Sequence, residues 1–170
     1  MANTYTQIHI HSVFTVRHRD GIIQIKWQDE LYKYITGIIQ ARDHKLLAIG
    51  GMSDHIHILF GFRPQHSLSD LMQEIKRSSS NWINENRFVR GRFSWQEGYG
   101  AFSYSRADLS KVIMYIQNQK EHHKKKTFMV EYLALLKEFE IEYDLRYIFK
   151  PVEMDFGEKI QFLPKFNPYL

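Results

Sequence analysis

At its most informative point the sequence reads Gly50-Gly51-Met52-Ser53-Asp54-His55-Ile56-His57-Ile58-Leu59-Phe60. At the two-residue period of a β-strand, His55, His57 and Leu59 point to one face and the intervening apolar side chains to the other. The apolar face can be buried in a core while the two imidazoles stand side by side. Because neutral imidazole is a common metal ligand, the pair offers half of a metal site. Two ordinary strand histidines are the alternative that this stretch alone leaves open.

The segments around this stretch follow the order β-α-β-β-α-β. The expected elements are a strand over 5–16, a helix over 27–42, a strand over 45–49 that Gly50-Gly51 turns into the histidine strand, a helix capped by Ser67-Leu68-Ser69-Asp70, and a strand or hairpin over 93–104. This order is typical of an α+β fold, the ferredoxin-like split βαβ unit, with an antiparallel sheet and helices on one face. Its first and third strands are central neighbours, so His9 and His11 are expected near the later histidine pair.

Two further helices are expected beyond this unit. Ser105-Arg106-Ala107-Asp108 resembles a capping box that opens a third helix, which runs to about Lys120 or beyond and carries Tyr115. Thr127 caps a fourth helix that ends near Glu140. We expect residues 1–150 to form one catalytic domain. Residues 151–170, which hold three of the four prolines, are expected to be a non-regular tail.

Composition bounds the class of protein. The chain has 170 residues, of which 44% are hydrophobic and 25% charged, as in ordinary globular domains. Its net charge of +4 suits a polyanionic partner without requiring one. The absence of cysteine excludes disulfides, thiolate zinc sites and cysteine nucleophiles. Without an apolar run long enough for a membrane span or a signal peptide, a cytoplasmic protein is the default expectation.

The third helix brings three polar side chains together. Tyr115, Gln119 and His122 are spaced i, i+4 and i+7, beside an apolar stripe formed by Leu109, Val112, Ile113 and Ile116. Tyr115 offers a hydroxyl nucleophile, and Gln119 offers a carbonyl oxygen suited to a hard metal ion. A packing tyrosine and a solvated glutamine are the plainer interpretation of the same residues.

Taken together, Asp54-His55-Ile56-His57 and Tyr115-Ile116-Gln117-Asn118-Gln119 resemble the HUH single-tyrosine transposases of bacterial insertion sequences that move as single-stranded DNA. The similarity covers roughly residues 4 to 150. Further stretches similar to that family are Tyr5-Thr6-Gln7-Ile8, Gly50-Gly51-Met52, Ser67-Leu68-Ser69-Asp70-Leu71-Met72, Ser79-Ser80-Asn81-Trp82-Ile83-Asn84, Trp95-Gln96-Glu97-Gly98-Tyr99-Gly100-Ala101-Phe102, Asn118-Gln119-Lys120-Glu121-His122-His123 and Ile141-Glu142-Tyr143-Asp144.

The resemblance implies a chemistry and a set of ligands. His55, His57 and Gln119 would bind Mg²⁺ or Mn²⁺, and Tyr115 would attack the scissile phosphate to form a covalent 5′-phosphotyrosine. Such enzymes cut and rejoin single-stranded DNA near hairpin ends. They are homodimers that act on DNA of the nucleoid, and in several members the tyrosine helix of one protomer completes the active site of the other.

Other residues have less specific roles. His122, or a metal-bound water, would take the proton of Tyr115. Two basic groups are candidate contacts for DNA phosphates, with a solvated basic edge as the alternative. They are Lys120, Lys124, Lys125 and Lys126 after the nucleophile, and Arg87, Arg90 and Arg92 before the aromatic stretch. We expect His9 and His11 to be structural or to support the metal ligands, and Asp54 to be a turn residue.

Three other functions remain open at this point. A domesticated relative would cut chromosomal repeat hairpins with the same active site. A catalytically silent module would bind single-stranded nucleic acid on the sheet, as RNA-binding domains do. A metal-dependent hydrolase would cleave without a covalent step. The presence of His55, His57, Tyr115 and Gln119 together argues against the silent module.

Overall fold

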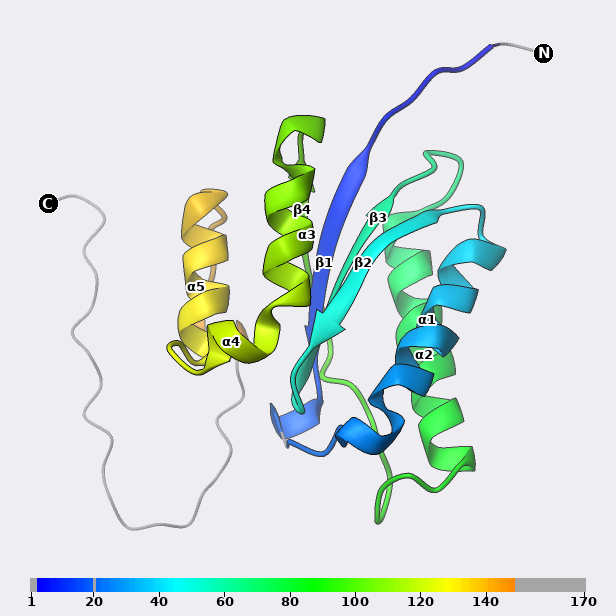
Figure 1. The fold of residues 1–170 in the computed structure, drawn as a ribbon, viewed down its shortest axis with the longest axis vertical. Helices are drawn as coiled ribbons and strands as arrows, with labels where there is room; N and C mark the ends of the chain where they lie inside the picture. The colour runs from blue at the N-terminus through cyan, green and yellow to red at the C-terminus, as the bar shows by residue number, and fades with distance from the viewer. Residues whose placement is uncertain (1–2, 20, 149–170) are drawn as a thin grey trace, which may run out of the picture.

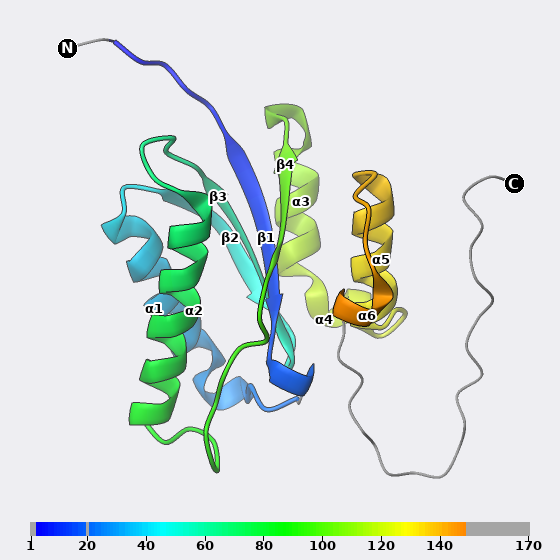
Figure 2. The same cartoon turned by 180° about the vertical axis from the view of Figure 1, so that it is seen from behind.

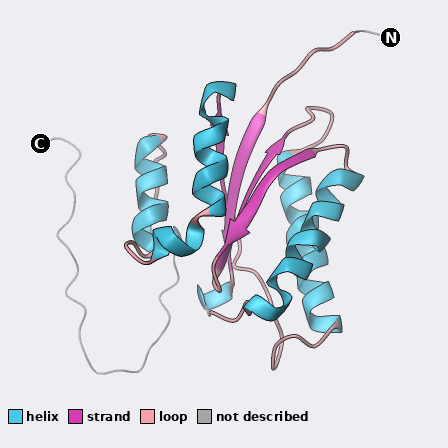
Figure 3. Cartoon of the chain, viewed as in Figure 1, coloured by secondary structure: helices cyan, strands magenta, loops and turns pink. Residues whose placement is uncertain are grey.

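The histidine-bearing strand lies inside a four-stranded antiparallel sheet, the middle layer of the protein (Figure 3). A computed structural model describes residues 3–19 and 21–148. The strands stand in the order β2-β3-β1-β4. Their bounds are β1 (His9–Thr15), β2 (Lys45–Gly51), β3 (His55–Gly61) and β4 (Gly100–Tyr104).

The central position of β1 and β3 confirms the ferredoxin-like order. Val13 lies opposite His57, and His11 lies opposite Leu59. Because directly opposed residues of an antiparallel pair share a face, His11 and His57 point to the same side of the sheet. The register therefore brings His11 to the later histidine pair, whereas His9 lies opposite Gly61 at the other end of β3.

One face of the sheet is covered by α1 (Ile25–Ala41) and α2 (Leu68–Glu85), as Figures 1 and 2 show. The alternation in β3 sends its isoleucines to this face, where they meet the apolar stripes of both helices. Ser67 caps α2, because its hydroxyl accepts a hydrogen bond from the Asp70 N–H. The main core includes Phe14, Leu31, Ile35, Ile39, Ile56, Ile58, Phe60, Met72 and Ile75.

The opposite face carries the additional helices α3 (Leu109–Gln117), α4 (Gln119–His123) and α5 (Phe128–Glu138). Helices thus cover both faces of the sheet, and the two helices of the ferredoxin-like unit, α1 and α2, lie on the same face. Thr127 caps α5 by accepting a hydrogen bond from the Val130 N–H, as predicted. Short turns complete the described chain: η1 (Arg17–Arg19), η2 (Arg106–Asp108) and α6 (Leu145–Ile148).

The expected turn at Gly50-Gly51 is wrong by a few residues. Both glycines belong to β2, and the chain reverses over residues 52–54. A Cβ at Gly50 would lie 2.3 Å from the Ile116 carbonyl oxygen, and one at Gly51 would lie 2.2 Å from that of His55. Close approach of neighbouring backbone, rather than turn conformation, therefore requires glycine at both positions.

The expected single helix from Ser105 to Lys120 is also wrong, because it is broken. After the turn η2, α3 ends at Gln117, and Asn118 leaves the helical region with φ −97° and ψ 23° before α4 begins. Asparagine favours such helix ends because its side chain competes with the backbone for hydrogen bonds. Tyr115 and Gln119 therefore lie on two different helices.

Of the aromatic stretch 93–104, the part that forms a strand is Gly100–Tyr104. Trp95 makes an isolated bridge to Val16, and its side chain lies in the core with that of Phe93. The expected tail, 151–170, lies outside the described residues. Across the described ranges, no helix combines the length and apolar character that a membrane crossing demands.

Candidate active site

The two histidines of β3 lie side by side on the face covered by α3, α4 and α5. Both side chains have an exposed fraction of 0%, and their ring centroids are 5.1 Å apart. His57 Nδ1 forms a hydrogen bond of 2.8 Å with His11 Nε2. His57 Nε2 is buried and has no hydrogen-bond partner among the described residues. A ring held at one nitrogen with a free lone pair at the other is the usual state of a metal-binding histidine.

His55 is held in the same way by an acid. Its Nδ1 lies 2.7 Å from Asp54 Oδ1, which leaves Nε2 facing Gln119 Oε1 at 3.2 Å. If Nδ1 donates to the carboxylate, neutral His55 has a lone pair at Nε2, and the amide oxygen is also an acceptor. Two acceptors that face one another fit a cation bound between them. The donor set and the unpaired His57 nitrogen are thus suited to a divalent ion.

Gln119 is the first residue of α4 and is 1% exposed. Its amide nitrogen donates to the Tyr115 carbonyl at 3.3 Å and to Glu131 Oε1 at 3.1 Å. Because both partners are acceptors, they fix the amide orientation and turn Oε1 toward His55. His123 Nε2 lies 3.0 Å from the same Oε1.

A buried carboxylate, that of Glu131 from α5, joins this group. Glu131 Oε1 lies 3.5 Å from His57 Nε2, and Oε2 lies 3.8 Å from His55 Nε2. The ligand atoms of these three residues all lie within 4.8 Å of one another. Sequence reasoning missed Glu131, although it precedes Leu135 by one helical turn and so stands in the apolar stripe of α5. A carboxylate in such a stripe is the signal that could have found it.

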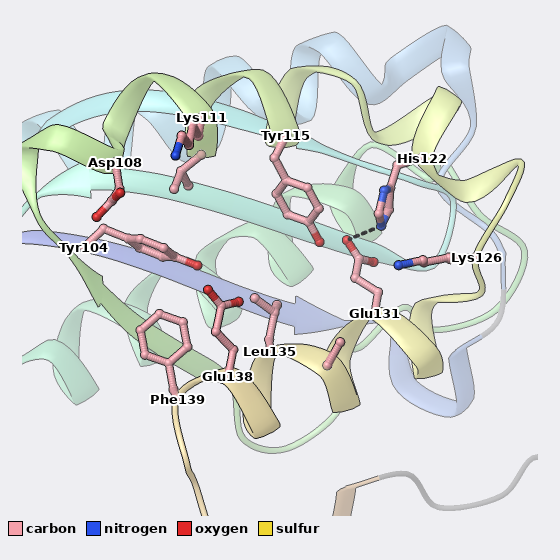
Figure 4. A pocket seen from close by; sticks show the side chains of 12 residues that line it. Tyr104, Asp108, Lys111, Tyr115, His122, Lys126, Glu131, Leu135, Glu138 and Phe139 are labelled. Carbon is pink, nitrogen blue, oxygen red and sulfur yellow. Dashed lines mark ion pairs between the residues drawn. The ribbon is translucent and has the colours of Figure 1, made fainter.

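Tyr115 comes from α3 and lies beside the histidines. Its ring centroid is 5.6 Å from that of His57 and 6.2 Å from that of His11. The hydroxyl is buried and has no hydrogen-bond partner in the described part of the chain. Figure 4 shows Tyr115 and Glu131 projecting toward one another from α3 and α5. The nucleophile candidate therefore lies next to the metal-site candidate of the same chain.

A cavity of about 560 Å³ opens beside Tyr115, between α3 and α5. Its wall combines acidic, basic and apolar side chains, so it offers contacts to both charged and apolar groups of a ligand. The lining residues are Tyr104, Asp108, Lys111, Val112, Tyr115, His122, Lys126, Glu131, Ala134, Leu135, Glu138 and Phe139.

His122, the candidate base, lies against the Tyr115 ring with 5.1 Å between centroids. Its Nε2 is 3.8 Å from Glu131 Oε1. Partial burial and the nearby Lys126 ammonium lower the pKa of His122 below its ordinary value. A neutral imidazole at neutral pH is able to accept a proton.

Burial shifts the pKa values of Glu131, His123 and His57. It raises the pKa of Glu131 to about 8, helped by the Asp54 carboxylate, and lowers the pKa of His123 to about 4. The pKa of His57 falls well below its ordinary value, first through burial and then through the neighbouring histidines. Neutral histidines are the form that binds metal, and a bound cation would favour the charged form of Glu131.

The two basic groups lie on different sides of the molecule. Lys120, Lys124, Lys125 and Lys126 are exposed on α4 and the turn after it, and the last two line cavities that Tyr115 also lines. Arg87, Arg90 and Arg92 are exposed in the loop after α2, on the other side of the sheet (Figure 1). Of the aromatic residues considered for base stacking, Trp95 and Phe102 are buried and Tyr99 is 37% exposed.

A sequence family and several solved structures match this chain. The sequence model of the family described as "Transposase IS200 like" matches residues 4–119. The ISDra2 transposase TnpA of Deinococcus radiodurans is 20% identical over 118 residues, which cover 66% of this chain and 84% of that protein.

Two solved structures share the fold. One is a protein of Deinococcus radiodurans R1 assigned as a transposase, with a TM-score of 0.57 and 21% identity; the match covers 70% of this chain and 95% of that one. The other is a REP-associated tyrosine transposase bound to a REP hairpin, with a TM-score of 0.56 and 15% identity. That match covers 96% of this chain and 98% of the other.

Proposed function

This chain belongs to the family of IS200-like transposases, and from that premise we propose that it cuts and rejoins single-stranded DNA near hairpin ends through a covalent bond to Tyr115. The observation that carries the proposal is the meeting of half-buried Tyr115 with the buried side chains of His55, His57 and Gln119. A protein that merely binds nucleic acid has no need of all four.

The residues of the metal-site candidate fit Mg²⁺ or Mn²⁺. His55 Nε2, His57 Nε2 and Gln119 Oε1 would hold the ion, and the unpaired His57 nitrogen supports this assignment. When bound, the ion would polarise the scissile phosphate and offset the charge that develops in the transition state. Asp54 and His11 would keep the two rings in the orientation that binding requires.

Tyr115 would carry the covalent step. Its hydroxyl oxygen attacks phosphorus, the bond from phosphorus to the 3′ oxygen breaks, and the leaving oxygen takes a proton to become a 3′-hydroxyl. The 5′-phosphate stays joined to Tyr115. Attack of another 3′-hydroxyl on that phosphotyrosine reverses the step and joins the strands, so no ATP is consumed.

His122 would accept the phenol proton. A free phenol has a pKa near 10 and is protonated at neutral pH, so the attack requires a base. The contact between the two rings and the lowered pKa of His122 support this role.

The DNA would lie along the lysine group. Lys120, Lys124, Lys125 and Lys126 follow the nucleophile, and Lys126 lines the cavity beside it. The hairpin bound by the REP-associated relative supports a hairpin substrate here. A homodimer, with the tyrosine acting in cis, completes the proposal.

A second candidate function is that of a domesticated enzyme that cuts chromosomal repeat hairpins without moving its own gene. The match to the REP-associated transposase over 96% of this chain favours it. Both candidates use the same site, and hairpin-bearing element ends beside the gene would favour the mobile form.

The decisive experiment mixes the protein with labelled single-stranded DNA from the flanks of its own gene, with and without Mg²⁺. We expect an adduct that resists denaturation, is destroyed by protease and requires the metal. Tyr115→Phe should abolish the adduct and spare hairpin binding, as should His57→Ala. Tyr143→Phe, at an exposed tyrosine, is the control. Cleavage without an adduct would replace the proposal with a hydrolase.

A further inference from the structure

Glu131 is placed in the histidine group by a well-anchored helix. Its exposed fraction is 3%. The apolar side of α5, with Phe128, Leu135 and Leu136, packs on Val13 and Phe102 of the sheet. Because this packing fixes the helix, the carboxylate is held against the histidines by the fold rather than by a flexible loop.

The carboxylate has few of the partners that a buried acid requires. Gln119 Nε2 donates to Oε1, but Oε2 accepts no hydrogen bond within the described residues, even though His123 Nε2 lies 2.8 Å away. No lysine or arginine of the described chain forms an ion pair with it. The charged form of a buried carboxyl group that has only histidines and an amide around it is costly, and a bound cation would offset this cost.

The spacing of the surrounding atoms suits such a cation. Glu131 Oε1 lies 3.5 Å from His57 Nε2, and His55 Nε2 lies 3.2 Å from Gln119 Oε1. Adjacent ligands of an octahedral ion at about 2.1 Å are about 3.0 Å apart, so each pair needs little movement to become a pair of neighbouring ligands. The unpaired His57 Nε2 and Glu131 Oε2 belong to the same small group.

We propose that Glu131 is a fourth ligand of the divalent ion, beside His55, His57 and Gln119; this inference rests on the metal site proposed above. The other three ligands are neutral, so Glu131 supplies the negative charge of the set. Hard cations such as Mg²⁺ and Mn²⁺ prefer carboxylate oxygen, and the charge raises affinity for them. An octahedral ion with these four ligands keeps two positions for phosphate or water.

The test measures metal binding rather than cleavage. Mn²⁺ is titrated into the full-length protein without DNA, and free Mn²⁺ is followed by electron paramagnetic resonance. Glu131→Gln keeps the shape of the side chain and an oxygen acceptor, so it removes mainly the charge. Because loss of a residue that merely supports a ligand costs about 10–100-fold in affinity, Glu131→Gln should weaken Mn²⁺ binding by at least about tenfold.

The matched control is Glu138→Gln, which lies on the same helix, is exposed and lines the same cavity. It should bind Mn²⁺ as the wild type does. Glu131→Asp keeps the charge and should retain more affinity than Glu131→Gln. Wild-type affinity in Glu131→Gln, or a weaker Glu131→Asp than Glu131→Gln, would overturn the assignment.

His57→Ala separates this inference from the function on which it rests. If His57→Ala loses Mn²⁺ binding while Glu131→Gln keeps it, Glu131 is no ligand and the metal site stands. If His57→Ala binds Mn²⁺ normally, the metal site itself is wrong. Circular dichroism and melting of each variant without metal check that the fold is intact.

Discussion

The imidazoles of His55 and His57 each have one nitrogen occupied by a neighbour and the other turned toward the metal-site candidate. His11 holds one ring and Asp54 the other. The sequence predicted a supporting role for His11, which the structure agrees with, but it treated Asp54 as a turn residue. Asp54 is both, because the reversal before β3 brings its carboxylate to His55 Nδ1. Orientation of the candidate ligands therefore depends on residues outside the candidate ligand set.

We expect Asp54→Ala to weaken Mn²⁺ binding by about 10–100-fold without unfolding the protein, because His55 loses the partner that fixes its ring. Titration of Mn²⁺ into the variant measures this. Asp29→Ala, at an exposed aspartate of α1, is the control. Equal affinities of Asp54→Ala and the wild type would mean that the sheet alone orients His55.

At the scale of elements, the site depends on how closely α3 approaches β2. The Ile116 carbonyl oxygen would lie 2.3 Å from a Cβ at Gly50, and Ile116 packs with Ala48 and Leu59 under the helix. Tyr115 adjoins Ile116 in sequence, so any outward shift of α3 also moves the nucleophile candidate away from His57.

Gly50→Ala should cost about 1–3 kcal/mol of unfolding free energy, the usual cost of overpacking, and should reduce adduct formation more than hairpin binding. Urea unfolding and the adduct assay measure the two effects. Gly37→Ala is the control, since no atom lies within 4 Å of a Cβ there, and alanine in a helix should stabilise by about 0.5–1 kcal/mol. A harmless Gly50→Ala would show that α3 can shift freely.

A second effect belongs to the junction between α1 and β2. Buried His44 accepts a hydrogen bond from the Arg63 N–H at its Nδ1 and stacks on Phe62. Burial first, and then the charges of His66 and Arg63, lower the pKa of His44. Below about pH 6.5, His44 therefore binds a proton in the unfolded chain but stays neutral in the folded chain. Because the unfolded state binds more protons, the free energy of unfolding falls as the solution is acidified.

His44→Gln removes this titration and keeps an oxygen acceptor for Arg63. We expect its melting temperature to fall less between pH 7 and pH 5 than that of the wild type. Equal slopes would mean that other groups control acid stability.

For the whole molecule, the position of the lysine group on the tyrosine side predicts where the cleaved strand runs. Changing Lys124, Lys125 and Lys126 together to Gln should weaken binding and lower the slope of log K against log salt by up to about 2, since each phosphate contact to a single strand contributes about 0.7. Changing Arg87, Arg90 and Arg92 together should have a smaller effect, because that loop lies across the sheet. Binding isotherms at several salt concentrations measure both effects. A larger effect of the arginine changes would mean that the DNA binds on the other face.

A mixing experiment tests whether the tyrosine acts in cis. Tyr115→Phe and His57→Ala are each inactive in our proposal, and in a dimer with exchanged helices a mixed pair would regain one intact site. Because Tyr115 lies beside His57 of its own chain, we expect mixed and re-equilibrated protomers to form no adduct. Recovered adduct would establish the exchange.

The sequence predicted what local chemistry determines. Strand alternation gave the faces of β3, and Ser67 and Thr127 marked the starts of α2 and α5. The sequence did not predict the break at Asn118, because the helical pattern continues on both sides of that residue. It also did not predict the position of Glu131, which depends on how α5 packs on Val13 and Phe102. The resemblance supplied Gln119 as a ligand candidate, and the structure places its Oε1 3.2 Å from His55 Nε2.

The grouping of Tyr115, His55, His57, Gln119 and Glu131 within one chain bears on gene dosage. If a lone copy holds a whole site, the cutting rate should rise in simple proportion to the number of copies in the cell. For an enzyme whose active site forms only in a dimer, the cutting rate at low protein concentration falls with the square of that concentration. Even a weakly expressed gene would then give activity in proportion to the amount of protein.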